Sequence, residues 1–377
     1  MKIAVNTLPL LDNRAGAERY TQNIIRHLIA ADPRNVYYLV LSKVNQAFYG
    51  SDQENAHNLV WGGNTRNKLI RILGEQAYLP WLVRRKGLDL LFSPCNIGPR
   101  NPPVPMVITL FDLHWLRFPE LFSPLRLAYL RRALTWSARK AEAILTISEN
   151  SKKDLIKLLG IPEEKITVTY PGLDPIFEKA PSPEEHAALR KTFGLGDKFI
   201  LFVGQLHRRK NALGLIRAFQ LLKEQGPLEY QLVLAGGEGD GSTEIRDYIR
   251  QQPRGEIIVT GCIPDEAIRT LYHQAACLVY PSFYEGFGLP VLEAMACGCP
   301  VITSNVSSLP EVAGEAALLI DPYRIETITT ALVSLLTNPD LSPSLIQKGL
   351  GQARRFTWEA AARKTLAVFE KVMAARG

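Results

Sequence analysis

Short apolar runs alternate with amphipathic stretches along the whole chain, and this alternation restricts the fold more than any other feature of the sequence. The runs of the first half are Ile3–Val5, Tyr37–Leu41, Leu88–Phe92, Val107–Leu110, Ala143–Ile147 and Ile166–Thr169. Those of the second half are Phe199–Val203, Gln231–Ala235, Ile257–Thr260, Leu278–Tyr280, Val301–Thr303 and Leu318–Ile320. Runs without clean polar alternation are typical of strands buried on both faces of a parallel sheet. Each series therefore predicts a doubly wound α/β domain.

The length of 377 residues suits two such domains, and a rigid, turn-rich segment at Tyr170–Pro175 marks the expected boundary between them. We predict an N-terminal Rossmann-like domain over residues 1–172 and a second one over residues 173–357. The amphipathic stretch Trp358–Met373 could close either domain, and residues 358–377 are a possible completion of the first. Because ligands of doubly wound sheets bind beyond the carboxyl ends of the strands, we expect the domains to face each other across a ligand-binding cleft.

The net charge of +7 is unevenly distributed along the chain. Residues 1–175 contain 23 Lys and Arg against 15 Asp and Glu, a net charge of +8, so the first half is expected to meet an anionic partner. Two basic segments with interleaved aromatic residues, Arg66–Gly87 and Arg126–Ala143, favour peripheral contact with an anionic membrane, although each could also be a solvated helix face. Nucleic acid is not expected, because no recognised binding module accompanies the charge.

The five cysteines are scattered and form no Cys-x-x-Cys pair, which favours free thiols in a reducing compartment. The N-terminus has no basic leader followed by an apolar region, and no window approaches 18 uninterrupted apolar residues. We therefore expect a cytoplasmic protein, with the inner face of the membrane as an alternative location.

The segment from Tyr284 to Ala294 carries the strongest chemical signal. Two carboxylates, Glu285 and Glu293, flank a Gly-x-Gly turn and Pro290. Pro290 suits the first turn of a helix, and the glycines allow backbone amides to approach a ligand closely. A helix N-terminus attracts phosphate, so the segment predicts a site for a phosphate and hydroxyl-rich groups, as in a sugar nucleotide. The alternative is a buried strand–turn–helix with two incidental glutamates.

A cationic cluster follows the predicted strand Phe199–Val203. It begins at Gly204 and contains Arg209 and Lys210. Guanidinium and ammonium groups suit the neutralisation of a pyrophosphate at the carboxyl edge of a sheet. A solvated basic turn is the competing interpretation.

Together with Cys297–Val301 and Ser307–Glu311, these two segments resemble the retaining glycosyltransferases with two Rossmann-like domains, the GT-B type. More narrowly, the chain is similar to the family-4-like branch that includes bacterial mannosyltransferases. The resemblance covers essentially the whole chain and is strongest between Val203 and Pro322.

The resemblance implies roles for individual residues. Arg209 and Lys210 would grip the donor diphosphate, Glu285 would contact the transferred sugar, and Glu293 would accept hydrogen bonds from the ribose. Further donor contacts are implied for Gly16, Gly204, Ile263, Gly286, Phe287, Gly288 and Leu289. Gly16 belongs to the segment Asn13–Tyr20, which resembles the glycine loop of the family, and the main chain near Ile263 would meet the base. No metal or other cofactor is implied, because the cations and the helix terminus supply the positive field.

The chain departs from the family at one position. The family commonly places a His-Asp pair after an N-terminal strand, and here the matching residues are Phe111 and Asp112. Three residues after Phe111, His114 could reach the same space and help catalysis, or it could be an ordinary polar loop residue. Asp112 is a candidate for an acceptor-side or structural role.

The expected function is transfer of a hexose, first of all mannose from GDP-mannose, to a glycan or lipid-linked acceptor with retention. Such a reaction belongs to the synthesis of cell-surface polysaccharide or glycolipid. Because Phe111 occupies the expected His position, a non-catalytic subunit that binds sugar nucleotides or glycans is an alternative. A nicotinamide dehydrogenase is excluded, since the segment Val5–Leu10 lacks the Gly-x-Gly-x-x-Gly turn.

Overall fold

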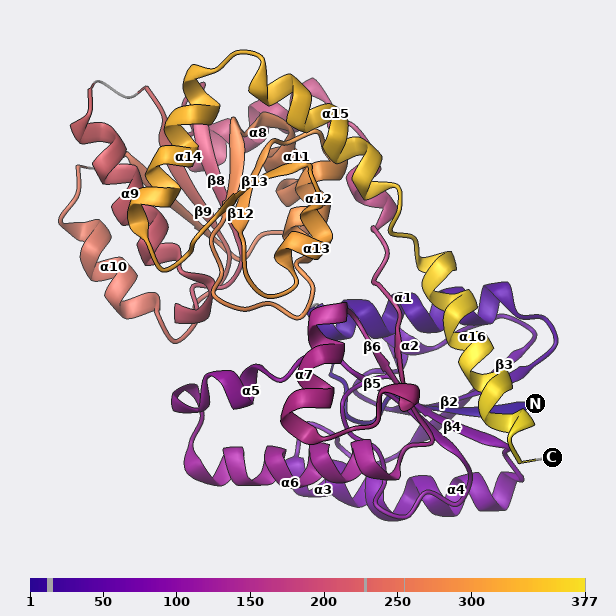
Figure 1. The fold of residues 1–377 in the computed structure, drawn as a ribbon. Coiled ribbons are helices and arrows are strands. Elements are labelled where there is room, and N and C mark those ends of the chain that lie inside the picture. The colour runs from indigo at the N-terminus through magenta and orange to yellow at the C-terminus, as the bar shows by residue number, and fades with distance from the viewer. Residues whose placement is uncertain (12–15, 227–228, 254, 377) are drawn as a thin grey trace. The chain divides into compact units, whose positions relative to one another are not determined.

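The computed structural model describes residues 1–11, 16–226, 229–253 and 255–376 (Figure 1). The chain forms two compact units, each with its own sheet. Unit 1 comprises Met1–Gly172 and Thr357–Gly377, and unit 2 comprises Leu173–Phe356. Among the described residues, no helix has the length and apolar character needed to cross a membrane.

Unit 1 contains seven parallel strands in the order β3-β2-β1-β4-β5-β6-β7. Their bounds are Lys2–Asn6 for β1, Val36–Ser42 for β2, Ala56–Trp61 for β3, Leu90–Ser93 for β4, Met106–Leu110 for β5, Ala143–Thr146 for β6 and Ile166–Val168 for β7. The strand order reverses at β1, which lies between β2 and β4. In doubly wound sheets, such a switch point opens a crevice for ligands.

Every strand predicted for the first half is present, but β3 was not predicted. It is the edge strand, none of its residues is fully buried, and the side chains of His57, Asn58 and Val60 are exposed. Its sequence therefore lacks the apolar run that marks the buried strands. Parallel pairing with β2, from Tyr37 opposite Ala56 to Ser42 opposite Trp61, holds it in the sheet.

Helices cover both faces of the first sheet (Figure 1). They are α1 (Gly16–Ala31), α2 (Gln46–Tyr49), α3 (Lys68–Leu73), the π-helical turn η1 (Gly74–Tyr78), α4 (Leu79–Lys86), α5 (His114–Arg117), α6 (Pro124–Lys140), α7 (Glu149–Leu159) and α16 (Trp358–Ala374). Successive residues of a strand point to opposite faces of the sheet. Leu91 of β4 packs in the core with α4 and α6, whereas the ring centroid of the next residue, Phe92, lies 5.1 Å from that of Phe369 in α16.

Helix α16 packs beside α1 in unit 1. Trp358 is buried, and its ring centroid lies 5.7 Å from that of Tyr20. At the junction of the units, a Cβ on Gly172 would lie 2.2 Å from the backbone nitrogen of Trp358. Only glycine fits this close approach of two chain segments.

Unit 2 contains six parallel strands in the order β10-β9-β8-β11-β12-β13. Their bounds are Phe199–Val203 for β8, Gln231–Ala235 for β9, Ile257–Gly261 for β10, Cys277–Tyr280 for β11, Val301–Ser304 for β12 and Ala317–Ile320 for β13. All six predicted runs are therefore confirmed as strands. The order reverses at β8, which pairs with β9 on one side and β11 on the other.

The helices of unit 2 also lie on both faces of its sheet (Figure 1). They are α8 (Pro183–Phe193), α9 (Ala212–Glu224), α10 (Ser242–Arg250), α11 (Asp265–Gln274), α12 (Leu289–Ala296), α13 (Leu309–Ala313), α14 (Ile325–Thr337) and α15 (Leu341–Ala353), with the short 3-10 turns η4 (Pro175–Glu178) and η5 (Arg208–Lys210). The start of α8 shows how local sequence sets these bounds: Ser182 and Glu185 form a reciprocal capping box around Pro183, and Gly194 ends the helix in a left-handed conformation.

Candidate functional site

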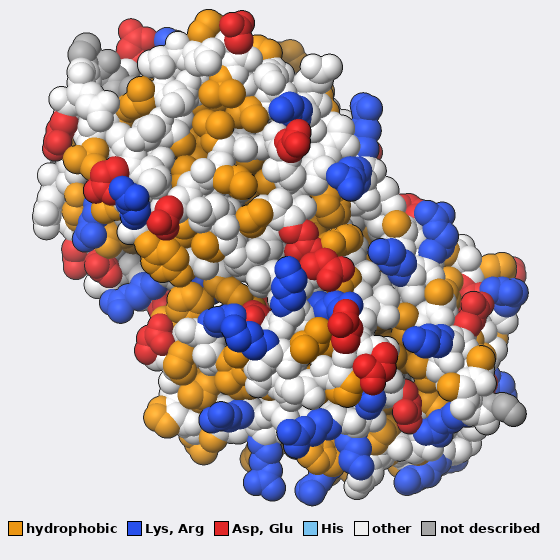
Figure 2. Space-filling view, in the orientation of Figure 1, with side chains coloured by type: hydrophobic (Ala, Val, Ile, Leu, Met, Phe, Trp, Pro, Cys, Tyr) orange, Lys and Arg blue, Asp and Glu red, His pale blue; other side chains and the backbone are white. Residues whose placement is uncertain are grey.

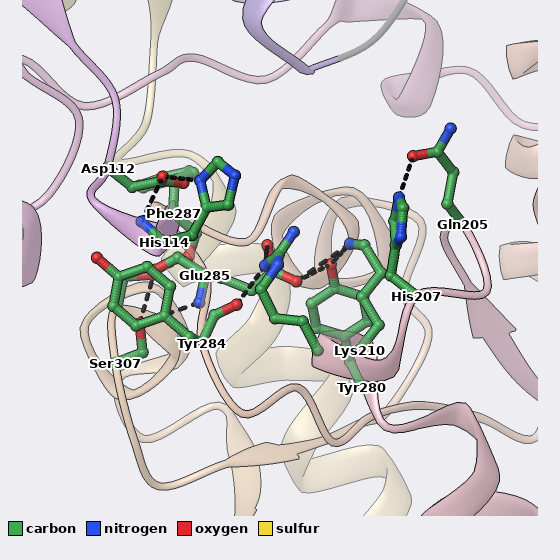
Figure 3. A network of polar contacts seen from close by, with 12 residues as sticks. Asp112, His114, Gln205, His207, Lys210, Tyr280, Tyr284, Glu285, Phe287 and Ser307 are labelled. Atoms are coloured by element: carbon green, nitrogen blue, oxygen red, sulfur yellow. Dashed lines mark hydrogen bonds and ion pairs between the residues drawn. The ribbon is translucent and has the colours of Figure 1, made fainter. Parts of the chain in front are cut away.

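Glu285 is bound by two cations in unit 2 (Figure 3). Its Oε2 lies 2.9 Å from Nη1 of Arg209, and its Oε1 lies 3.1 Å from Nζ of Lys210. The three side chains are between 10% and 16% exposed, so the cluster is largely shielded but still reaches the surface. Two segments that sequence reasoning singled out separately thus meet at one carboxylate.

The sheet topology explains this meeting. Arg209 and Lys210 lie in η5, soon after β8, and Glu285 follows β11. Strands β8 and β11 are neighbours at the switch point, so their carboxyl ends emerge side by side. Asn211, in the left-handed region with φ of 55°, then turns the chain into α9, and its Nδ2 donates to the carbonyl of Pro322 over 2.9 Å.

Tyr280 completes the polar cluster from the end of β11. Its hydroxyl donates to Oε1 of Glu285 over 2.9 Å and accepts a hydrogen bond from Lys210 (Figure 3). Sequence reasoning missed Tyr280, because an aromatic residue in an apolar run is indistinguishable from ordinary core. Its position, five residues before the glutamate at a strand end, is the one signal that was available.

Ser307 and Ser308 hold the backbone of Glu285. The hydroxyl of Ser307 accepts from the Glu285 amide over 3.0 Å and donates to the Glu285 carbonyl over 2.7 Å. The Ser308 hydroxyl lies 2.9 Å from the same carbonyl and 2.7 Å from that of Phe287. Ser307 has a φ of 62°, a strained value for a residue other than glycine, and its two hydrogen bonds offset that strain. These serines lie in the segment Ser307–Glu311, but their contacts could not be derived from sequence.

Burial and charge act in opposite directions on the ionisable groups of the cluster. Burial raises the pKa of Glu285, but Arg209 and Lys210 outweigh burial and hold that pKa well below its usual range. Burial lowers the pKa of Lys210, and the charge of Glu285 offsets part of this effect. Burial and Glu285 together raise the pKa of the Tyr280 phenol. With Arg209, Lys210 and Glu285 ionised, the three groups carry a net charge of +1, a suitable field for an anion.

The turn after Glu285 leads into α12 as the sequence predicts. Gly288 has a φ of 114°, Pro290 lies in the first turn, and a Cβ on Gly288 would meet Cδ2 of Leu309 at 2.7 Å. Phe287, between Gly286 and Gly288, is buried, and its ring centroid lies 5.5 Å from that of Phe356. The buried Phe287 side chain therefore holds this glycine-containing turn against unit 2. The amide of Leu289, at the start of α12, has no acceptor within that helix and can bind an anion, whereas Pro290 has no N–H and the amides of Val291 and Leu292 donate to the carbonyl of Gly288.

Glu293 lies inside unit 2, on α12. Its Oε2 accepts a hydrogen bond from the hydroxyl of Tyr272 over 3.1 Å. Glu293 is only 4% exposed. Its charge acts on Lys210, whose pKa it raises, so both glutamates belong to one electrostatic cluster. A buried carboxylate with polar partners is a suitable acceptor for hydroxyl groups.

The remaining predicted residues of unit 2, Gly204 and Ile263, follow β8 and β10 at the carboxyl edge of the sheet, and β9 lies between these two strands. Gly204 follows β8 with a φ of 147°, and a Cβ there would lie 3.0 Å from Cδ of Lys210. Ile263 is half-buried and follows β10 at the edge of the same sheet. Gly204 therefore adjoins the cationic cluster directly, whereas Ile263 shares only the sheet edge with it.

The other predicted residues belong to unit 1. Phe111 follows β5 and is buried edge-on against Tyr20, with ring centroids 5.1 Å apart. Oδ1 of Asp112 accepts from the backbone amide of His114 over 3.1 Å and also binds Nδ1 of its ring (Figure 3). His114 is thus oriented by Asp112 while its ring stays 39% exposed. Gly16 begins α1, and residues 13–15 of its segment lie outside the described residues.

In the described parts of the chain, no group of three or more His, Cys, Asp or Glu residues is placed to hold a metal ion. The five cysteines form no disulfide. The positive groups at the centre of the unit 2 cluster are the side chains of Arg209 and Lys210.

Two family models match the chain, one for each half. The model described as "Glycosyltransferase Family 4" matches residues 14–177, and the model described as "Glycosyl transferases group 1" matches residues 186–351. The chain is also 35% identical to O-antigen chain mannosyltransferase B of Escherichia coli, over 98% of this chain and 100% of that protein.

Solved structures show the same fold at low sequence identity. A sucrose-phosphate synthase from Thermosynechococcus elongatus aligns over 99% of both chains with a TM-score of 0.76 and 19% identity. Anabaena HepE in complex with UDP and glucose aligns over 98% of this chain and 100% of that one, with a TM-score of 0.72 and 20% identity.

Proposed function

This chain belongs to the GT-B glycosyltransferases of family 4, and we propose that it transfers mannose from GDP-mannose, with retention, to a glycan or lipid-linked acceptor. The E. coli relative that matches over its full length is named as an O-antigen chain mannosyltransferase, which supports mannose as the sugar and a cell-surface polysaccharide as the product. The HepE structure was obtained with UDP and glucose, so a UDP-hexose is the competing donor.

One observation carries the proposal: Arg209 and Lys210 converge on Glu285 at the switch point of the second sheet. When the bond between the sugar C1 and the phosphate oxygen breaks, both bonding electrons go to the nucleoside diphosphate. Cations fixed beside that diphosphate stabilise the charge that develops, and removal of one such group typically costs about 10²- to 10³-fold in kcat. The amide of Leu289 at the start of α12 would add a further donor for the same oxygens.

Glu285 would have two roles in this reaction. Without donor, its carboxylate holds Arg209 and Lys210 in place, so little reorganisation is needed when the diphosphate arrives. With donor, its remaining lone pairs would accept hydrogen bonds from hydroxyls of the transferred sugar. Retention would follow if the acceptor hydroxyl attacks C1 on the face that the diphosphate leaves and gives its proton to the departing phosphate oxygen.

A thermal-shift panel of UDP, GDP, ADP and their sugars tests the donor. A ligand present at about 100 times its Kd should stabilise the protein by roughly 2.7 kcal/mol, and we expect GDP and GDP-mannose to do so selectively. Lys210→Met should abolish this stabilisation. Lys198→Met, which removes an exposed lysine of the same unit, is the matched control and should retain it.

Transfer itself is tested with GDP-mannose and an oligomannoside acceptor, with the anomeric configuration of the product determined by NMR. We expect the α-linkage of the donor in the product. A β-linked product would contradict retention. If UDP and its sugars stabilise the protein selectively in the thermal-shift panel, the donor is a UDP-sugar and not GDP-mannose.

Phe111, which is buried and stands where the family's His is expected, favours one alternative, a non-catalytic subunit that binds sugar nucleotides or glycans. Under that alternative, donor would bind but neither transfer nor donor hydrolysis would occur. Activity that disappears in both Glu285→Ala and Lys210→Ala, in protein that remains folded, would exclude it.

A further inference from the structure

Three helices of unit 1 present large apolar side chains to solvent. Leu69 and Leu73 on α3 are 78% and 60% exposed, and Leu125 on α6 is 84% exposed. Trp81 on α4 and Tyr129 on α6 are 49% and 43% exposed. Scattered single exposures are normal on protein surfaces, but side chains of this size that lie on neighbouring helices mark an interaction surface.

The helices that carry these side chains lie on the same face of the first sheet, opposite α1 and α16 (Figure 1). The segment after β4 links them. The carbonyl of Gly98 accepts from Gln76 of η1, its amide donates to Ser137 of α6, and the amide of Arg100 donates to Gln76 over 2.7 Å. In addition, the charges of Glu75 and Arg71 act on the phenol of Tyr129. Helices α3, α4 and α6 therefore form one surface.

This surface is strongly basic. Its exposed cations are Arg66, Lys68, Arg84, Arg85, Lys86, Arg126, Arg131, Arg132, Arg139 and Lys140. Helix α6 contains no acidic residue, and the single acid of residues 66–86 is Glu75, which is buried and faces Arg71. Lys and Arg side chains recur along this part of unit 1 in the space-filling view (Figure 2).

Aromatic rings lie directly beneath several of the cations. The guanidinium of Arg85 lies 5.0 Å from the ring centroid of Trp81, and that of Arg126 lies 5.2 Å from the ring of Phe122. Lys140 and Arg100 lie 5.7 Å and 5.2 Å from the ring of Trp136. A bilayer interface places acyl chains next to anionic headgroups. Exposed leucines suit the acyl chains, amphipathic rings suit the boundary, and Arg and Lys side chains suit the headgroups.

We propose that the surface formed by α3, α4 and α6 binds an anionic phospholipid bilayer. Leu69, Leu73 and Leu125 would enter the boundary of the acyl chains, and the surrounding Arg and Lys side chains would bind lipid phosphates. The proposal goes beyond the transfer reaction and does not depend on it, because bilayer binding needs neither donor nor acceptor.

Co-sedimentation with vesicles tests the proposal. The protein should bind vesicles of phosphatidylcholine with 30% phosphatidylglycerol and release them at high salt, and it should bind pure phosphatidylcholine weakly. The double variant R131Q/R132Q should weaken binding by about 30-fold, since each cation near an anionic surface contributes about fivefold. The double variant L69S/L125S should weaken it by roughly tenfold or more.

Matched controls lie in unit 2. R354Q/R355Q removes a second pair of adjacent exposed arginines, and L221S/L319S removes two apolar side chains that are 38% and 44% exposed. Both controls should bind vesicles like the wild type. Equal binding to neutral and anionic vesicles, or equal losses in the variants and their controls, would overturn the proposal.

Two further readouts separate the bilayer from other occupants. Brominated anionic lipids should quench the Trp fluorescence of the wild type more than that of W81F. If the wild type instead self-associates in sedimentation experiments, and L69S/L125S abolishes this without affecting vesicle binding, the surface is an interface between copies and the proposal fails. Donor binding should be unchanged in all of these variants, so a failure here would leave the proposed transfer reaction intact.

Discussion

Arg209 and Glu285 form a two-residue clamp, in which the guanidinium Nη1 lies 2.9 Å from the carboxylate Oε2 and also donates to the backbone carbonyl of Tyr284. One arginine therefore fixes both the side chain of the glutamate and the backbone of the loop that carries it. Lys210 occupies the other oxygen of the same carboxylate.

Glu285→Gln should destabilise unit 2 as well as reduce transfer. The substitution leaves Arg209 and Lys210 buried beside a neutral amide, and breaking a buried pair in this way costs about 3–5 kcal/mol. Because the folded pKa of Glu285 is lowered, its stabilisation is present above the unfolded pKa of about 4.3 and is lost as pH falls through the folded pKa. Between these two pKa values the stabilisation falls by about 1.4 kcal/mol per pH unit, so urea denaturation at pH 7.5 and pH 3 should show a clearly smaller difference between variant and wild type at pH 3. A constant difference would mean that the charge of Glu285 is not what stabilises the cluster.

Glu75→Gln should have the opposite pH dependence. Glu75 lies in the π-helical turn η1, 3.9 Å from Nε of Arg71, and burial raises its pKa to about 7. The folded state then binds a proton more tightly than the unfolded state, so wild-type stability falls as pH rises from about 4.3 to about 7. Glutamine is neutral throughout, and the variant should gain on the order of 3 kcal/mol relative to the wild type between pH 4 and pH 8.

Denaturant titrations of wild type and Glu75→Gln at these two pH values measure that gain. Glu54→Gln, at an exposed position of the same unit, is the control and should follow the wild type. If the relative stability of Glu75→Gln does not change with pH, then Glu75 is ionised in the folded protein across this range.

Gly236→Ala should displace the turn that carries Gly204. Gly236 follows β9 with a φ of 159°, and a Cβ there would lie 2.0 Å from the carbonyl oxygen of Gly204. Because the clash is with backbone, the turn after β8 must move, and with it Arg209 and Lys210. We expect at least a tenfold increase in the Kd for the donor nucleotide by calorimetry. Gly351→Ala, where a Cβ would meet nothing within 4 Å, should leave that Kd unchanged.

Chelation should leave transfer unaffected. The proposed chemistry places the diphosphate on Arg209, Lys210 and the helix terminus, so we expect the same kcat after treatment with EDTA as before it. A loss of activity that Mg²⁺ or Mn²⁺ restores would show that a metal ion accompanies the donor and that the two cations do not suffice.

The sequence alone determined the two series of buried strands and the turn that starts α12. Apolar runs, Pro290 and Gly288 act over a few residues, and their effects depend little on the rest of the chain. The same local logic singled out Arg209, Lys210 and Glu285 as polar groups at strand ends. It missed β3, because an exposed edge strand needs no apolar run and is held in place by its neighbour β2.

Tertiary structure decided which of those groups meet. Arg209 and Glu285 are brought together because β8 and β11 are adjacent in the sheet although β9 and β10 separate them in sequence. The contacts of Tyr280, Ser307 and the buried Glu75 likewise depend on strand order and helix packing, which follow from burial of the whole apolar surface rather than from any short segment. Local sequence sets the bounds of each element, but only the folded core sets the distances between residues that are far apart in the chain.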